Sequence, residues 1–154
     1  MKPTEPVLQM QDDAIVQFVR ENYTRKIVEI GVGQRLNVAE RMKETMPTIE
    51  VLVTDTQESL IRGYDGTRVK AIVDNVFSPS VQVYQGASLI YSLNPPVEMI
   101  PALEGLAKEI GADLFVRLMS DEQDFFYGNN KWHRILRQGL WIGWLLAFKG
   151  HETV

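Results

Sequence analysis

The chain has no cysteine and only two histidines, His133 and His151, among its 154 residues. The absence of cysteine excludes disulfides, thiolate metal sites and cysteine nucleophiles, and it fits the reducing conditions of the cytoplasm. Two scattered histidines do not provide the ligand set of a zinc site. We therefore expect a cytoplasmic protein that holds no metal.

The sequence also lacks an excess of basic residues and any long apolar run. Its formal net charge is -4, whereas binding to nucleic acid relies on Lys and Arg that neutralise phosphates. The first residues, MKPTEPVLQMQDD, do not show the basic and then apolar pattern of a signal peptide. The longest apolar stretch, residues 140–148, falls well short of the ~20 residues that span a bilayer. Neither nucleic acid nor a membrane is an expected partner.

Short apolar or β-branched runs make up most of the rest of the chain. They predict five buried strands, at residues 26–31, 50–55, 69–75, 87–93 and 112–118. Near-continuous apolar runs of this kind are typical of parallel strands in a sheet that is covered by helices on both faces. We therefore expect one α/β domain over residues 1–154, with a mostly parallel sheet of five to six strands and a core at 26–118.

The segments between the strands predict helices at residues 12–22 and 35–44 and from near Ile100 to Gly111, with Pro101 in the first turn. Only VFSPSVQVYQG joins the third and fourth strands, which is about the minimum for a parallel crossover and leaves no room for a full helix. Residues 140–148 suit a strand or a buried helix. Gly143 favours a sixth strand, because glycine costs about 1 kcal/mol in a helix interior. Residues 121–137 would then form a connecting helix, interrupted around 128–130.

Polar residues gather where the predicted strands end. The first strand ends at Glu29 and the loop GVGQR, the second at Asp55, the third at Asp74 and Asn75, and the fourth at SLNPP. Ligands of open α/β sheets bind at the carboxyl ends of the strands, where the strand order reverses. If the first and fourth strands are neighbours, the glycine loop and SLNPP lie on opposite sides of one crevice.

Each of these residues has a chemical role in such a crevice. Gly31 and Gly33 allow a tight turn and a close approach to a ligand, and the helix that follows directs amide donors at a carboxylate or phosphate. Asp55 suits the two hydroxyls of a ribose. Asp74 could accept a hydrogen bond from an exocyclic amine such as that of adenine, and Glu29 could face an ammonium group. Together these residues suit an adenosine ligand with a charged tail.

Simpler structural roles stay open for the same residues. The two glycines could form a tight turn that binds nothing, and Asp55 could be a helix N-cap. Asp74 and Asn75 could equally cap the following loop. Asn94 and Pro95 could form the entry turn of the next helix. If they are functional, the Asn94 side-chain oxygen and the Pro95 carbonyl would accept hydrogen bonds from a substrate amine, so that catalysis would be mainly positioning.

The motifs EIGVG, VTD, VDN and SLNPP, in this order, resemble the first four motifs of the S-adenosylmethionine-dependent class I methyltransferases. With FSP, YQGASLIYSL, PPVE and GAD, the chain is similar to a family of short archaeal proteins of unknown function. The resemblance implies a reduced Rossmann-like domain of the methyltransferase type. It makes S-adenosylmethionine the expected cofactor, with Asn94 and Pro95 as candidate catalytic residues. The motifs depart from the family pattern in GVGQR, which lacks a third glycine, and at Val97, where amino-group methyltransferases have an aromatic residue.

Three hypotheses for function follow. The first is a minimal methyltransferase-like protein that binds S-adenosylmethionine or a related adenosine ligand. The alternative is a non-catalytic Rossmann-like protein with a regulatory or assembly role. The third, an NAD-binding oxidoreductase, is disfavoured because a full GxGxxG is absent. The tryptophans at the C-terminal end, Trp132, Trp141 and Trp144, suit either the core or a homodimer contact.

Overall fold

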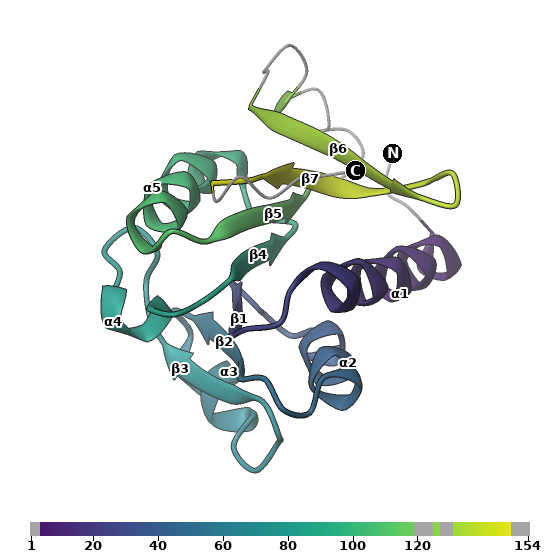
Figure 1. Ribbon diagram of the computed structural model, residues 1–154. Helices are drawn as coiled ribbons and strands as arrows, with labels where there is room; N and C mark the ends of the chain where they lie inside the picture. The colour runs from purple at the N-terminus through teal and green to yellow at the C-terminus, as the bar shows by residue number, and fades with distance from the viewer. Residues whose placement is uncertain (1–3, 119–124, 127–130, 149–154) are drawn as a thin grey trace.

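The computed structural model describes residues 4–118, 125–126 and 131–148 (Figure 1). In chain order the elements are α1 (Glu5–Asn22), β1 (Ile27–Ile30), α2 (Asn37–Thr45), β2 (Val51–Asp55), α3 (Glu58–Gly63), β3 (Lys70–Val73), α4 (Val81–Tyr84), β4 (Leu89–Leu93), the 3-10 helix η1 (Val97–Met99), α5 (Ile100–Ile110), β5 (Asp113–Arg117), β6 (Trp132–Arg137) and β7 (Leu140–Leu146).

The strands form one sheet in the order β3-β2-β1-β4-β5-β7-β6. Strands β1 to β5 are parallel, and β7 runs antiparallel to both of its neighbours. Ile27 of β1 lies opposite Val51 of β2 on one side and Leu89 of β4 on the other. The five predicted strands and the adjacency of the first and fourth are therefore confirmed, and the strand order reverses between β1 and β4.

Helices cover the sheet on both faces, as Figure 1 shows for α1 and α2 on one side and α5 on the other. The first face carries a core cluster formed with α1, α2 and α3, and the second carries a cluster formed with α4 and α5. Successive strand residues alternate between the two clusters, so Ile27 belongs to the first and Val28 to the second. This double coverage is the reason why the strands are apolar along their whole length.

The helices differ from the prediction mainly at α1, which begins at Glu5 rather than at residue 12. The amide of Val7 donates to the hydroxyl of Thr4, the N-cap residue, and Pro6 lies in the first turn, where its missing N–H costs nothing. The short α3 was not predicted. The helix α5 begins at Ile100 as predicted, and α4 is a single turn, which confirms the trimmed crossover. None of the helices in the described part of the chain is long and apolar enough to cross a bilayer.

The C-terminal part corrects the prediction for residues 121–137. Residues 132–137 form β6 and not a connecting helix, and β6 pairs with β7 through a turn at Gln138 and Gly139, both with positive φ. Residues 119–124 and 127–130 lie outside the described residues. The sequence gives only a weak signal for this hairpin. A register shift between Ile135 and Leu136 breaks the alternation of inward and outward side chains in β6, and Gln-Gly is a weaker turn signal than Asn-Gly. The strand predicted at 140–148 is confirmed as β7. It lies between β5 and β6, so β6 is the edge strand on this side of the sheet.

We expect Gly143→Ala to lower the free energy of unfolding by about 2 kcal/mol, as overpacking of a core does. A Cβ atom at this position of β7 would lie 2.4 Å from Cζ of Phe115 and 2.8 Å from the backbone oxygen of Val116. The matched control is Gly105→Ala on the exposed side of α5, where the added atom meets nothing within 4 Å. That change should be neutral or stabilising by up to about 1 kcal/mol. Urea unfolding of both variants tests this, and equal stabilities would contradict the close packing of β7 on β5.

Candidate functional site

The loop after β1 turns at two glycines in the left-handed region, Gly31 with φ 72° and Gly33 with φ 59°. The amide of Gly31 donates to the carbonyl of Thr54 at 2.9 Å, and the amide of Gly33 donates to Oδ2 of Asp55 at 2.9 Å. The hydroxyl of Tyr64 donates to the carbonyl of Gly33. The loop is therefore held from β2 and from the end of α3, and its glycines meet the conformational requirement that the sequence predicted.

Asp55 braces the glycine loop, and its role in ligand binding stays a prediction. Its Oδ2 accepts from Gly33, and its Oδ1 accepts from the amide of Gln57 at 3.0 Å, so the carboxylate starts the turn that leads into α3. The N-cap of α3 is Gln57, so Asp55 is not itself the cap. Each carboxylate oxygen can accept a second hydrogen bond, which leaves capacity for the hydroxyls of a ligand.

Asp74 and Asn75 shape the loop that follows β3. Asp74 accepts from the amide of Ser80 at 3.1 Å and from the hydroxyl of Tyr84 at 2.6 Å. Asn75 accepts from the amide of Phe77 at 3.0 Å. The capping role that the sequence analysis left open is therefore present in the structure. These bonds also order the loop around a hollow.

This hollow, of about 300 Å³, lies at the ends of β1, β2 and β3 and is lined by Gly31, Asp55, Asp74, Asn75, Phe77 and Met99, among others. Phe77 is an apolar ring with 60% of its surface exposed beside these polar groups. A flat heterocycle with amine and hydroxyl substituents would find both a stacking surface and acceptors here. We call this the β2–β3 hollow.

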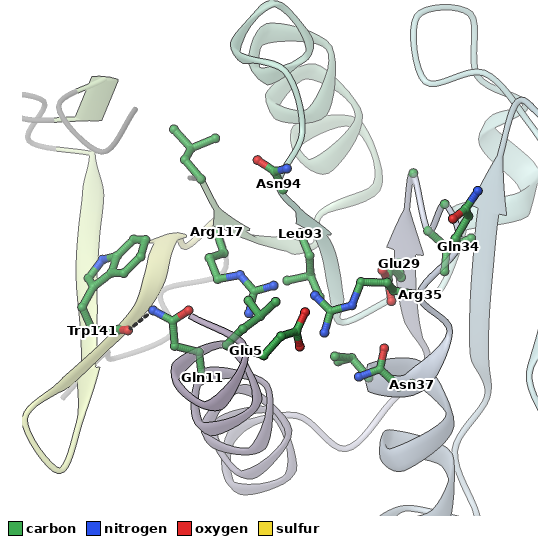
Figure 2. A pocket seen from close by; sticks show the side chains of 16 residues that line it. Glu5, Gln11, Glu29, Gln34, Arg35, Asn37, Leu93, Asn94, Arg117 and Trp141 are labelled. Atoms are coloured by element: carbon green, nitrogen blue, oxygen red, sulfur yellow. Dashed lines mark hydrogen bonds between the residues drawn. The ribbon is translucent and has the colours of Figure 1, made fainter. Parts of the chain in front are cut away.

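A larger pocket, of about 430 Å³, lies on the other side of the glycine loop (Figure 2). Its lining comes from α1, the glycine loop, the start of α2 and the ends of β4 and β5, with Trp141 of β7 as a wall. Gly31 lines both the pocket and the β2–β3 hollow, so the two spaces meet at the loop. The structure thus brings Glu29, Gly31, Gly33 and Asn94 to one pocket, and Gly31, Asp55, Asp74 and Asn75 to the adjoining hollow.

Glu29 lies at the floor of the pocket with 2% of its surface exposed. Burial raises the pKa of its carboxyl to about 8. The hydroxyl of Tyr91, which donates to Oε1 at 2.9 Å, and the positive charges of Arg117 and Arg35 counteract this rise, while Asp12 adds to it. Glu29 is therefore largely protonated at neutral pH. A cationic group placed beside it would favour the carboxylate.

Ion pairs around a buried carboxylate, which the sequence did not predict, form the wall next to Glu29. The carboxylate of Asp12, 1% exposed, accepts from Arg117 at 2.7 Å through one oxygen and from Arg35 at 2.6 Å through the other. Asn37 also donates to it, at 3.3 Å. An acidic residue on the same helical face as Ile15 was the available signal, because a charge on an apolar face needs a partner.

Asn94 follows β4 with φ 64°, a left-handed conformation that asparagine tolerates better than most residues. Its backbone N–H donates to the carbonyl of Arg117 at 2.6 Å, which ties the end of β4 to the end of β5. Its side chain lies at the pocket (Figure 2). Pro95 is buried behind it, and η1 starts directly after Pro96. Asn94 therefore belongs to the entry turn of η1 and also lines the pocket.

The three tryptophans have different surroundings. Trp132 and Trp144 are buried around Phe126, with ring centroids 4.3 Å and 5.2 Å from the Phe126 ring. They belong to the core of the chain itself. Trp141 is only partly buried and faces the pocket. A homodimer through this segment stays a prediction.

The sheet order, the glycine loop at its reversal point and the acidic residue at the end of β2 together define a Rossmann-like domain of the class I methyltransferase type. Its fold is similar to that of the antibiotic-resistance methyltransferase Kmr, with a TM-score of 0.61 at 12% identity over 96% of this chain and 95% of that one. It is also similar to a human methyltransferase 10 domain containing protein, with a TM-score of 0.59 at 11% identity over 96% and 85% of the two chains. The plantazolicin methyltransferase BpumL, solved in complex with SAH, has a TM-score of 0.55 at 15% identity over 72% and 47%.

The chain belongs to the uncharacterised protein family UPF0146, whose model matches residues 11–135. A UPF0146 protein of Archaeoglobus fulgidus is 39% identical over 103 residues, which are 67% of this chain and 75% of the relative. A UPF0146 protein of Methanocaldococcus jannaschii is 32% identical over 108 residues, 70% of this chain and 77% of the relative. These matches confirm the resemblance to a family from archaea with a methyltransferase-like fold.

Because the carboxyl of Glu29 has an ordinary pKa near 4.5 when unfolded and about 8 when folded, the folded state holds the extra proton between these values. The free energy of unfolding should therefore fall as the pH rises from about 4.5 to 8. Glu29→Gln keeps the shape, stays neutral and should lose most of this decline, so that it is more stable than the unmutated protein at pH 8.5. Urea unfolding at pH 5 and pH 8.5 measures the difference. Glu98→Gln, at an exposed position, is the control and should leave this decline unchanged. If the decline also stays unchanged in Glu29→Gln, the raised pKa does not belong to Glu29.

Proposed function

We propose that the chain binds S-adenosylmethionine or a related adenosine ligand across the glycine loop, as a minimal methyltransferase-like domain. The observation that carries the proposal is the hydrogen bond from Gly33 to Asp55, which sets the acidic end of β2 beside a loop of two left-handed glycines. The adenosine would occupy the β2–β3 hollow, and its charged tail would enter the pocket on the other side of Gly31.

The chemistry of the residues fits such a ligand. Asp55 would accept from the ribose hydroxyls through the lone pairs that Gly33 and Gln57 leave free. Phe77 offers its exposed ring to the base. Glu29 would face the ammonium of the tail, and the nearby charge would lower the pKa of its carboxyl from about 8, so that binding releases a proton near neutral pH.

Bound S-adenosylmethionine would supply an electrophilic methyl group at the pocket side of the loop. The contribution of the chain would be to hold the acceptor in line with it, which is mainly a matter of positioning. Asn94 is the candidate for this task, because it lines the pocket, as Arg117 does. Pro95, the other candidate from the sequence, is buried and is not among the residues that line the pocket. The side-chain oxygen of Asn94 would accept a hydrogen bond from the substrate and would transfer no proton itself.

The non-catalytic alternative is favoured by one observation next to this position. Val97 follows the two prolines where the resemblance would lead one to expect an aromatic residue, and it packs against the core cluster on the α5 face. No stacking ring is offered at that place. A protein that binds the adenosine ligand for regulation or assembly would keep the hollow and the loop and need no acceptor site.

Asp55→Ala should weaken binding of S-adenosylhomocysteine at least about tenfold, because charged hydrogen bonds contribute about 1.5 to 3 kcal/mol. Calorimetric titration measures the affinity. The control is Tyr64→Phe, which removes the hydroxyl that braces Gly33 without touching the acceptor role of Asp55. It should lower the stability by about 1 kcal/mol and the affinity by much less than Asp55→Ala does. If the unmutated protein shows no binding at millimolar ligand, the proposed function is wrong.

Asn94 can be tested with two substitutions that separate its backbone from its side chain. Glycine adopts the positive φ of this position readily, so Asn94→Gly should keep the backbone conformation. Asn94→Ala should lower the free energy of unfolding by about 1 kcal/mol, because alanine is strained in the left-handed region. We expect both variants to change the affinity for S-adenosylhomocysteine by less than about twofold, because the side chain would contact the acceptor only. Methyl transfer to amino acceptors should be weak or absent in the unmutated protein. A robust transfer that disappears in both variants would make Asn94 catalytic and overturn the non-catalytic alternative.

A further inference from the structure

The end of the pocket farthest from the glycine loop contains a buried side chain with an unused acceptor. Gln11 of α1 is 5% exposed, and its Nε2 donates to the carbonyl of Trp141 at 3.0 Å. This bond fixes the orientation of the amide, because a carbonyl can only accept. Oε1 is left buried, without a hydrogen-bond partner in the described part of the chain. In Figure 2 this oxygen turns away from Trp141 and toward Arg117.

Arg117 supplies unused donors at the same place. It is 5% exposed, and within the described residues Nη1 is the one side-chain nitrogen of Arg117 that makes a hydrogen bond, to Asp12. A guanidinium has five N–H groups in a planar fork, and such a fork suits the two oxygens of a carboxylate. Figure 2 shows the guanidinium in the pocket between Gln11 and Leu93. A buried acceptor and a buried cationic donor therefore lie at one end of the pocket.

The charges around this end favour an anion. Two guanidinium groups, those of Arg35 and Arg117, share the single carboxylate of Asp12. Glu29, the other buried acid of the pocket, is protonated at neutral pH, because burial raises the pKa of its carboxyl to about 8. Glu5 also lines the pocket, but it lies on the exposed surface, where water screens its charge. Of the three charges in these ion pairs, Asp12 and Arg117 are buried and the side chain of Arg35 is 47% exposed, so the excess positive charge lies on the partly screened Arg35.

We propose that the Gln11–Arg117 end of the pocket binds a small molecule that carries a carboxylate next to a hydroxyl or amino group. The carboxylate would pair with Arg117, and the neighbouring O–H or N–H would donate to Oε1 of Gln11. The indole of Trp141 and the side chain of Leu118 would contact its apolar part. The binding stands on these residues alone, whereas the role of this molecule as a methyl acceptor beside Asn94 rests on the proposed function.

Three acids of the same carbon length test the chemistry. Propionate has only the carboxylate, L-lactate adds a hydroxyl and L-alanine adds an ammonium group. Titration of the full chain, followed by the amide shifts of residues at this end of the pocket in NMR spectra, gives three affinities. We expect lactate and alanine to bind about fivefold more tightly than propionate, as one additional hydrogen bond would. Equal affinities, or no shifts at Gln11 and Arg117, would overturn the proposal.

Two variants assign the contacts. Gln11→Met keeps the volume and should remove the preference for lactate over propionate, while Gln17→Met, the same change at an exposed position of α1, should leave it intact. Arg117→Lys keeps a positive charge near Asp12 and loses the fork, so all three acids should bind at least about tenfold more weakly. A preference for lactate that persists in Gln11→Met would contradict the assigned contact.

S-adenosylhomocysteine distinguishes a separate ligand from the amino-acid tail of the cofactor itself. We expect lactate to bind in its presence, and Gln11→Met to leave the affinity for S-adenosylhomocysteine unchanged. Competition between the two ligands, together with weaker binding of S-adenosylhomocysteine in Gln11→Met, would assign this end to the tail and overturn the proposal. Binding of lactate without any binding of S-adenosylhomocysteine would support this proposal and refute the proposed function. Binding of S-adenosylhomocysteine without any binding of the acids would support the proposed function and refute the proposal for this end of the pocket.

Discussion

The buried carboxylate of Asp12 is the interaction on which the pocket depends. It lies between the guanidinium groups of Arg117 and Arg35 and so joins α1, the end of β5 and the segment before α2. A charge buried to this degree is stable only when it is paired, and removing one partner of such a pair strongly destabilises a fold. The apolar face of α1 packs on the sheet, and the ion pairs of Asp12 add a polar link beside Gln11. This wall of the pocket is therefore held by ion pairs as well as by apolar packing.

The glycine loop separates two spaces that differ in chemistry. The β2–β3 hollow offers acceptors and an exposed ring, and the pocket beyond the loop offers the buried guanidinium of Arg117 and the partly exposed guanidinium of Arg35. The first suits a neutral nucleoside and the second suits a charged group. The reversal of strand order between β1 and β4 opens the crevice at the loop, and the loop itself is held by Thr54, Asp55 and Tyr64. One ligand that crosses the loop, or two ligands that meet there, would use both spaces.

Side chains at the strand ends have double roles, which explains why structural and functional interpretations of the sequence were hard to separate. Asp55 braces the loop and keeps acceptor capacity, and Asp74 orders the β3–α4 loop while it lines the hollow. Tyr84 and Tyr91 are fully buried in the core and also donate to Asp74 and Glu29. A local pattern places such a residue at an edge, but it does not show how many of its hydrogen bonds the fold already uses.

The sequence by itself determined the five parallel strands, the start of α5, the trimmed crossover and the polar residues at the strand ends, because these depend on local periodicity and on turn residues. Only the tertiary structure decided the pairing of β6 with β7, since that depends on a turn and a register shift without a clear local signal. Only the tertiary structure also brought Gln11, Asp12 and Arg117 together, because α1 and β5 lie about a hundred residues apart in the chain and meet through the packing of one helix face on the sheet. The energy of a buried polar group depends on its partners in space, and the order of residues along the chain does not contain them.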